Sequence, residues 1–213
     1  MSEVIVQGDA KYLTALDIAE KSILSLVFLF FLFRMLISTF GSGSSLNLFY
    51  LFDQLVILIF VIIRRGTTDI TTRPSEWFAG FGGTFVPLLV APIVIDSSLV
   101  PEVAVGALML TGFGIHISAK FTLRRSFGVV AANRGVKVSG PYRLVRHPMY
   151  TGYILVHAGL LIADPNIWNV FIIFLCWSLL LWRINAEERL LRADPMYREM
   201  AERIRFRLIP GLY

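Results

Sequence analysis

The sequence has a single cysteine, Cys176, among 213 residues. One cysteine excludes an internal disulfide and a cysteine-based metal site, and it leaves the redox compartment undetermined. Charged residues are also scarce, at 16% of the chain, whereas hydrophobic residues make up 56%. With a mean hydropathy of +0.69, this composition excludes an ordinary soluble domain and indicates a membrane protein.

Several signatures of soluble enzymes and binding modules are missing as well. No grouping of His, Cys, Asp and Glu has the spacing of a metal site, and no glycine-rich phosphate loop follows a strand pattern. The formal charge of +5 is poor evidence for nucleic-acid binding, because basic residues in membrane proteins mainly mark the side on which a loop lies. We therefore expect no metal ion and no nucleic-acid partner.

Apolar segments recur along the chain at lengths that suit membrane-crossing helices. We expect about six of them, at Ser22–Phe40, Leu46–Ile63, Phe78–Ile95, Val103–Ala119, Met149–Ala163 and Ile167–Trp182. Backbone groups in lipid must bond within their own segment, which leaves only helices for segments this apolar. Pro87 and Pro92 are expected to bend the third span, since each proline removes a helix hydrogen bond. The predicted fold class is an all-α membrane protein.

The last third of the chain continues this pattern. Asp164-Pro165-Asn166 is too short for anything but a hairpin, so the last two spans are expected to form a tight helical hairpin. The segment Arg183–Arg207 then carries apolar residues at helical multiples with charges between them, which predicts a cytoplasmic amphipathic C-terminal helix. These apolar residues are Leu190, Tyr197, Ala201 and Ile204.

The sequence shows no internal repeat and no second domain. We therefore expect one integral-membrane domain over residues 1–213. Within it, residues 22–119 would form a four-span N-terminal scaffold, and residues 120–213 would hold the catalytic connector, the hairpin and the tail.

Basic residues lie almost entirely in one set of loops. The turns at Gly41–Ser45, Asp96–Glu102 and Asp164–Asn166 hold no Lys or Arg, and only Arg34 of the 20 basic residues falls inside a span. By the positive-inside rule, both termini and the polar connector before the fifth span are cytoplasmic. This topology fits a multi-pass protein of the bacterial inner membrane or the endoplasmic reticulum. Arg34 is expected to pair with Asp53 at a similar depth.

A polar stretch from Gly140 to Gly152 stands where the connector meets the fifth span. It packs two Arg, one His, two Tyr and two Pro into thirteen residues. A plain juxtamembrane linker needs Lys and Arg but no His-Pro step flanked by tyrosines. Clustered titratable groups of this kind are typical of a functional site.

The motif Arg146-His147-Pro148-Met149-Tyr150, preceded by Gly140-Pro141-Tyr142 and followed by Glu187-Glu188, resembles the isoprenylcysteine carboxyl methyltransferase family of integral-membrane enzymes. The resemblance covers roughly residues 126–213. It implies an S-adenosylmethionine-dependent methyltransferase that acts on a lipophilic or lipidated acceptor at the membrane–cytoplasm boundary. A prenylcysteine carboxylate, a phospholipid amine and a small hydrophobic thiol or phenol all fit a site that opens to lipid.

The same resemblance implies roles for individual residues. The positions that line the family's cofactor pocket correspond to Arg134, Gly135, Val136, Lys137, Tyr142, His147, Pro148, Met149, Tyr150 and Glu187. The family commonly has a His near the position of Arg134. Its arginine one helical turn before the glutamate faces the acceptor. Arg183 and Glu187 are therefore the expected catalytic residues.

The residue types at these positions suit S-adenosylmethionine. Its sulfonium is a cation that an aromatic face or a carboxylate stabilises. Its carboxylate is matched by Arg, His or the N–H groups of the helix that starts near Pro148. Methyl transfer needs no dedicated nucleophile, so the protein has chiefly to align donor and acceptor and to exclude water. Membrane lipids are expected partners of the basic and aromatic side chains between Tyr142 and Tyr150.

Other interpretations stay open. Arg183 and Glu187 are spaced i,i+4 and could form a plain helix salt bridge, and Glu188 could be solvated. NADPH-dependent sterol and enone reductases share the C-terminal pattern, although Glu187-Glu188 favours the methyltransferase. A non-enzymatic or haem-binding module would use His116 or His157, which lie within spans, but the sequence shows no clear axial His pair.

Overall fold

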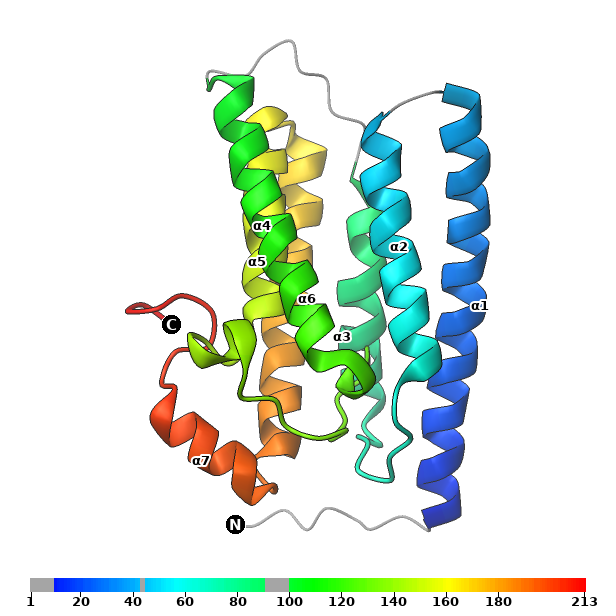
Figure 1. Ribbon diagram of the computed structural model, residues 1–213, viewed down its shortest axis with the longest axis vertical. Coiled ribbons are helices and arrows are strands. Elements are labelled where there is room, and N and C mark those ends of the chain that lie inside the picture. Colours follow the sequence, from blue (N-terminus) through cyan, green and yellow to red (C-terminus); the bar gives the residue numbers. More distant parts are fainter. Residues whose placement is uncertain (1–9, 43–44, 91–99) are drawn as a thin grey trace.

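The computed structural model describes residues 10–42, 45–90 and 100–213 of the chain (Figure 1). Helices account for most of the residues that the structure describes, and these residues contain no strand. The expected all-α class is confirmed.

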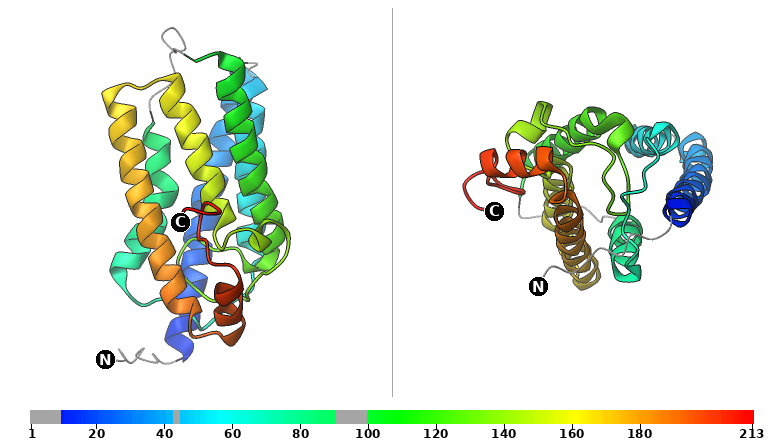
Figure 2. Two further views of the ribbon diagram at one scale, coloured as in Figure 1. Left: turned by 90° about the vertical axis from the view of Figure 1, so that its left-hand side faces the viewer. Right: turned by 90° about the horizontal axis from the view of Figure 1, so that it is seen from below.

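The helices stand side by side as an elongated bundle, and the last one lies at its lower end (Figures 1 and 2). In chain order they are α1 (Ala10–Ser42), α2 (Ser45–Ile63), α3 (Pro74–Phe85), η1 (Val86–Leu89), α4 (Glu102–Leu123), η3 (Arg124–Ser126), η4 (Gly140–Arg143), α5 (Pro148–Ala163), α6 (Ile167–Leu191) and α7 (Pro195–Arg203).

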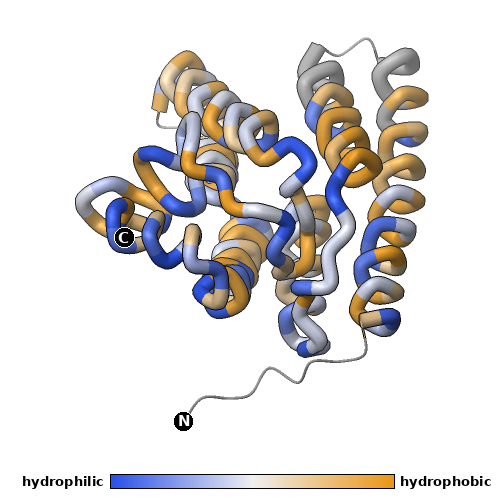
Figure 3. Tube along the Cα trace, turned by 60° about the horizontal axis from the view of Figure 1, so that its bottom comes forward, coloured by the Kyte–Doolittle hydropathy of each residue, from blue (hydrophilic) through white to orange (hydrophobic). Residues whose placement is uncertain are grey.

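Two described helices are long and apolar enough to cross a membrane, at Glu102–Ser126 and Ile167–Leu191. Two more, Leu51–Ile63 and Pro148–Ala163, are apolar but shorter. Hydrophobic residues run along the bundle, whereas hydrophilic ones gather at the lower end, around α7 and the polar segment between α4 and α5 (Figure 3). Together with the composition, these helices indicate a membrane protein, and the count of six spans stays a prediction.

The N-terminal boundaries differ from those expected. Helix α1 runs without a break from Ala10 to Ser42, so the residues before Ser22 and the first apolar segment form one helix. The expected turn at Gly41–Ser45 is correspondingly shorter, because Gly41 and Ser42 belong to α1 and Ser45 begins α2. The two residues between them lie outside the described residues.

The third apolar segment is interrupted at Pro87, as the sequence predicts. Helix α3 ends at Phe85, and the chain continues as the short helix η1. Proline cannot donate the hydrogen bond that an α-helix would need there. Pro92 and most of the expected turn at Asp96–Glu102 lie outside the described residues.

Helix α4 packs most closely against α5. Gly112 of α4 faces Gly152 of α5: a Cβ atom on Gly152 would lie 2.5 Å from the carbonyl oxygen of Gly112. Small residues allow two helix backbones to approach closely, which is a common way of packing helices in lipid. This contact fixes the start of α5, which carries the His-Pro motif, against α4.

Helices α5 and α6 are joined by the expected turn, but each packs mainly against a different helix. Asn166 caps α6 by accepting the N–H of Asn169, and Asp164 accepts a hydrogen bond from the Asn166 side chain. Beyond the turn, α5 packs mainly on α4, and α6 packs mainly on α3. The two helices therefore form a hairpin by connection rather than by tight mutual packing.

The single amphipathic helix expected over Arg183–Arg207 is wrong. Helix α6 continues to Leu191, and α7 begins at Pro195 after Asp194, which accepts the N–H of Met196. The Asp-Pro step explains the break, since Asp caps a helix and proline suits its first position. Arg183 therefore lies on the last turns of the apolar helix α6.

A buried ion cluster ties α1 to the connector, the segment from Arg124 to His147. We call its four members the α1 clamp: Asp17, Glu20, Arg64 and Arg134. The guanidinium of Arg134 lies 2.7 Å from both carboxylates, and that of Arg64 lies 3.1 Å from Asp17 and 2.9 Å from Glu20. All four side chains are buried, so each charge is neutralised within the cluster.

Glu20 also fixes the connector backbone. Its Oε1 accepts the N–H groups of Val129 at 3.0 Å and Val130 at 2.8 Å. The loop after α2 adds a backbone hydrogen bond of 3.0 Å from the N–H of Thr71 to the carbonyl of Ala131. The N-terminal helices thus position the connector, although they lie far from it in sequence.

The expected pairing of Arg34 with Asp53 is wrong. Arg34 is exposed on α1, and Asp53 accepts a hydrogen bond of 2.5 Å from Lys120. Lys120 lies on the last turn of α4 rather than in the connector, and it is fully buried. The buried lysine needs a carboxylate more than an exposed arginine does.

Candidate functional site

A pocket opens at the lower end of the bundle, among the connector, η4, the start of α5, the end of α6 and α7. Its cavity volume is about 90 Å³, and it is partly open to solvent. Nine of the ten expected cofactor residues line it: Arg134, Gly135, Val136, Lys137, Tyr142, His147, Met149, Tyr150 and Glu187. Pro148 and Arg183 do not line this pocket.

A sharp turn in the connector shapes one wall. Gly135 has a φ of +99°, in the left-handed region that favours glycine. Its N–H donates to the side chain of Asn133 at 3.0 Å, and the hydroxyl of Ser126 donates to the carbonyl of Arg134 at 2.9 Å. These bonds hold Val136 and Lys137 at the pocket.

Arg134 is placed differently from the other candidates. Its guanidinium is buried in the α1 clamp, where it donates to Asp17 and Glu20. The side chain is therefore already neutralised by the fold. Arg134 contributes to the pocket by anchoring the connector wall.

Glu187 is the centre of the polar contacts in the pocket. Its Oε1 accepts from the hydroxyl of Tyr150 and from Nε of Arg183, the latter at 3.1 Å. Its Oε2 lies 3.6 Å from Nδ1 of His147. The side chain of Glu187 is 19% exposed, whereas those of His147 and Arg183 are 6% and 4% exposed. Glu187 is thus the carboxylate of this group that a ligand can reach.

The aromatic ring of Tyr150 organises the same group. It stacks on His147 with ring centroids 5.7 Å apart, and the guanidinium of Arg183 lies 5.2 Å from its centroid. The structure therefore brings together His147, Tyr150, Arg183 and Glu187, as expected from the sequence.

Arg183 also has contacts outside this group. Its Nη2 donates to the carbonyl of Gly128 at 2.8 Å, and its Nη1 donates to the hydroxyl of Thr84 at 3.4 Å. Through these two bonds Arg183 joins α6 to α3 and to the connector. The i,i+4 salt bridge with Glu187 is present as well. These contacts leave part of the five-donor guanidinium for another acceptor.

Glu188 is not solvated, contrary to one interpretation of the sequence. It is 2% exposed and accepts from Arg146 at 2.9 Å, while Arg207 lies 2.8 Å and His147 3.3 Å from its carboxylate. Successive helix residues point about 100° apart, so Glu188 faces the connector and tail while Glu187 faces the pocket. Glu188 therefore binds the connector to the C-terminal segment.

Sequence reasoning missed two residues that close the pocket from α7, Tyr197 and Met200. Both are buried, and their i,i+3 spacing after the Asp194 cap could have indicated them. Burial raises the pKa of Tyr197, and the charge of Glu188 raises it further. The pKa of Tyr142 is raised in the same way, by burial and then by Glu187. Both phenols therefore stay protonated.

The two histidines inside spans lie apart from this pocket. His116 and His157 are buried in α4 and α5, and neither lines the pocket. Among the described residues, no group of three or more His, Cys, Asp or Glu side chains could hold a metal ion.

Residues 102–197 match the family model described as phospholipid methyltransferase. The match begins at the first residue of α4 and ends at Tyr197 of α7, so it includes the connector, the His-Pro motif and Glu187. No curated protein matches the chain. Over this segment, which is a little under half of the chain, the protein is similar to the phospholipid methyltransferase family, which covers the isoprenylcysteine carboxyl methyltransferase-like membrane enzymes.

Proposed function

We propose that the chain is an S-adenosylmethionine-dependent methyltransferase that acts on a lipophilic or lipidated acceptor at the membrane boundary. A prenylcysteine-like carboxylate is one such acceptor. One observation carries the proposal: nine of the ten expected cofactor residues, which are spread from Arg134 to Glu187, line a single pocket. The family match supports a membrane methyltransferase with a lipid substrate.

The pocket residues fit this cofactor. Tyr142, Tyr150 and Glu187 offer aromatic faces and a carboxylate, which stabilise a sulfonium cation. Lys137 and His147 offer donors for the carboxylate of its amino-acid part. When bound, S-adenosylmethionine supplies a methyl group that is already activated for displacement.

The protein's own part is alignment. In the proposed arrangement, Glu187 faces the positive end of the cofactor, and its bonds to Tyr150 and Arg183 hold the carboxylate in place. Arg183 anchors an anionic acceptor with the donors that its fold contacts leave available. Tyr197 and Met200 of α7 cover the pocket and exclude water.

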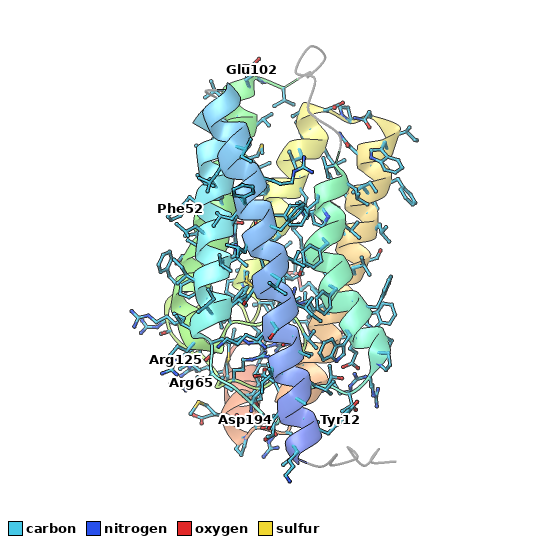
Figure 4. The ribbon with its side chains drawn as sticks, turned by 90° about the vertical axis from the view of Figure 1, so that its right-hand side faces the viewer. Tyr12, Phe52, Arg65, Glu102, Arg125 and Asp194 are labelled. Carbon is cyan, nitrogen blue, oxygen red and sulfur yellow. The ribbon has the colours of Figure 1, made fainter. Side chains whose placement is uncertain are left out.

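We propose a topology of six spans within one integral-membrane domain, with both termini and the pocket cytoplasmic. The membrane would be the bacterial inner membrane or the endoplasmic reticulum. Arg65 and Arg125 lie near the lower end of the bundle, whereas Glu102 lies at the opposite end (Figure 4). This distribution supports the positive-inside orientation. Labelling of Ser44→Cys from the cytoplasmic side would contradict it.

Isothermal titration of the purified full chain with S-adenosylhomocysteine, NADPH and haem in parallel tests the function. We expect S-adenosylhomocysteine alone to bind. Binding of NADPH would favour a membrane reductase of the sterol or enone type. Binding of haem would favour a haem-binding module, and no binding of any of the three would remove the support for an enzyme of this class.

A further inference from the structure

The pocket of the candidate site is smaller than the ligand proposed for it. Its cavity volume is about 90 Å³, whereas pockets for drug-sized molecules have volumes of about 300–1,000 Å³. Protein interiors are close-packed, so a larger ligand enters only if atoms of the wall are displaced. Binding of a molecule as large as S-adenosylmethionine therefore requires one wall of the pocket to move.

Helix α7 is the wall that the fold holds least firmly. It lies at the lower end of the bundle (Figures 1 and 2) and packs closely on no other described helix. Of its nine residues, Tyr197 and Met200 are the buried ones. The other walls are fixed by the α1 clamp, by the close contact of α5 with α4, and by the packing of α6 on α3. A segment with few buried apolar contacts opens at the lowest cost.

One carboxylate both caps α7 and ties it to the connector. Oδ1 of Asp194 accepts the N–H of Met196 at 2.8 Å, which caps the helix. Oδ2 of the same side chain accepts a hydrogen bond of 2.9 Å from Nδ2 of Asn133. This bond joins the start of α7 to a residue that lies 61 positions earlier in the chain.

Asn133 is itself held by three further hydrogen bonds. Its N–H donates to the carbonyl of Asp69 at 2.8 Å, and its carbonyl accepts the hydroxyl of Thr67 at 2.7 Å. Its Oδ1 accepts the N–H of Gly135 at 3.0 Å, and Gly135 lines the pocket. A single side chain, fixed to the loop after α2, thus contacts both the connector wall and the helix that covers it.

The opposite end of α7 is held by more bonds. Nη1 of Arg146 donates to the carbonyls of Ile204 at 3.0 Å and Arg205 at 3.2 Å. Nε of the same side chain donates to the buried Glu188 at 2.9 Å. Hydrogen bonds from a charged donor are among the stronger ones in proteins. The start of α7 is therefore the end that separates first.

We propose that α7 is a hinged cover of the pocket and that the hydrogen bond from Asn133 to Asp194 is the latch that holds it closed. When this bond breaks, the start of α7 swings away about its end at Ile204 and withdraws Tyr197 and Met200 from the pocket. Asn133 and Asp194 do not line the pocket, so they are positioning residues that set how fast a ligand exchanges. The identity of that ligand as S-adenosylmethionine rests on the proposed function.

Asn133→Asp is the variant that opens the latch. The aspartate keeps an oxygen for the N–H of Gly135 and keeps both main-chain bonds, but it places a second negative charge against Asp194, which repels it. In the double variant Asn133→Asp/Asp194→Asn, the donor and the acceptor exchange places. Asparagine caps a helix about as well as aspartate, so the double variant restores the latch.

Hydrogen–deuterium exchange of the full chain in detergent, without added ligand, tests the latch. We expect the amides of α7 to exchange about tenfold faster in Asn133→Asp and at the wild-type rate in the double variant. Asn185→Asp makes the same change at an exposed position of α6, and its exchange should stay within about twofold. The latch is overturned if Asn133→Asp exchanges like the wild type, if the double variant stays fast, or if the amides of α5 become equally fast.

The same variants test the effect on ligand exchange. By surface plasmon resonance, S-adenosylhomocysteine should associate with and dissociate from Asn133→Asp about fivefold faster than from the wild type, and the double variant should restore both rates. Unchanged rates in Asn133→Asp would overturn the role of α7 as the cover. Absence of binding to every variant would instead contradict the proposed function, and hydrogen–deuterium exchange would still decide whether the latch exists.

Discussion

Two buried groups of charges hold the connector, and they differ in what they leave accessible. In the α1 clamp, both carboxylates and both guanidiniums pair with one another, and their side chains are at most 6% exposed. At the end of α6, Glu187 is bonded as well but remains 19% exposed and lines a pocket. In both places a carboxylate pairs with a guanidinium inside the fold. Access from a pocket is what distinguishes the candidate site from the α1 clamp.

The two groups also differ in their place in the chain. Asp17, Glu20 and Arg64 lie outside the segment that matches the family, whereas Glu187 and its partners lie inside it. Arg134 lies inside the matching segment and lines the pocket, but its guanidinium pairs with the clamp carboxylates. The comparison predicts that stability follows changes in the clamp and that ligand affinity follows changes at Glu187.

The largest expected effect is that of Glu20→Ala. It leaves Arg64 and Arg134 buried without this carboxylate, and an unpaired buried charge costs about 3–5 kcal/mol. The free energy of unfolding in detergent should fall by about this amount. Glu199→Ala, at an exposed position of α7, is the reference and should stay within about 0.5 kcal/mol. A loss below about 1 kcal/mol for Glu20→Ala would mean that the clamp is not a structural element.

Glu187→Ala should act on binding. Removing one charge-assisted contact costs about 1.5–3 kcal/mol, so affinity for S-adenosylhomocysteine should fall about 10- to 100-fold by isothermal titration. The free energy of unfolding should fall less than in Glu20→Ala. The proposed difference between the two groups is contradicted if Glu187→Ala unfolds as easily as Glu20→Ala and its folded fraction binds S-adenosylhomocysteine with the affinity of the wild type.

Arg183→Ala should act on the acceptor instead. Turnover of a lipophilic acceptor should fall about tenfold, the loss expected for one charge-assisted hydrogen bond, while affinity for S-adenosylhomocysteine changes little. A plain salt bridge predicts another result: both Arg183→Ala and Glu187→Ala lose stability together, and the folded fraction keeps its activity and cofactor affinity. Parallel unfolding and turnover measurements separate the two.

The smallest expected effect is that of Tyr197→Phe. The change removes only a hydroxyl from the pocket wall, and a neutral hydrogen bond contributes about 0.5–1.5 kcal/mol. Affinity for S-adenosylhomocysteine should fall about two- to tenfold in the same titration, with the melting temperature nearly unchanged. Unaltered affinity would show that α7 covers the ligand without bonding to it.

The sequence predicted which candidate residues lie close together better than it predicted the contacts that support them. His147, Tyr150 and Glu187 are brought together as expected, because the resemblance already linked the motif to the end of α6. The helical class followed from apolar segments that must satisfy their own backbone. Both predictions depend on strong local patterns.

Contacts between distant segments could not be predicted in this way. The sequence assigned Arg134 to the cofactor, but its partner Asp17 lies 117 residues away. Counting residues from the first turn placed Arg34 opposite Asp53, but it could not show that α4 would bring Lys120 to that carboxylate. The Asp194-Pro195 step could have indicated the break between α6 and α7. The prediction missed it because the helical spacing of the apolar residues continues across the break.

The α1 clamp has a consequence for the order in which the chain assembles. Glu20 and Arg134 are separated by 114 positions, so α1 leaves the ribosome long before the connector is made. Until the connector is made, Arg64 is the one cation of the clamp with which Asp17 and Glu20 can pair. Contacts over such separations form late in folding. The pocket wall is therefore completed only when the connector, which is synthesised late, packs against α1, which is synthesised early.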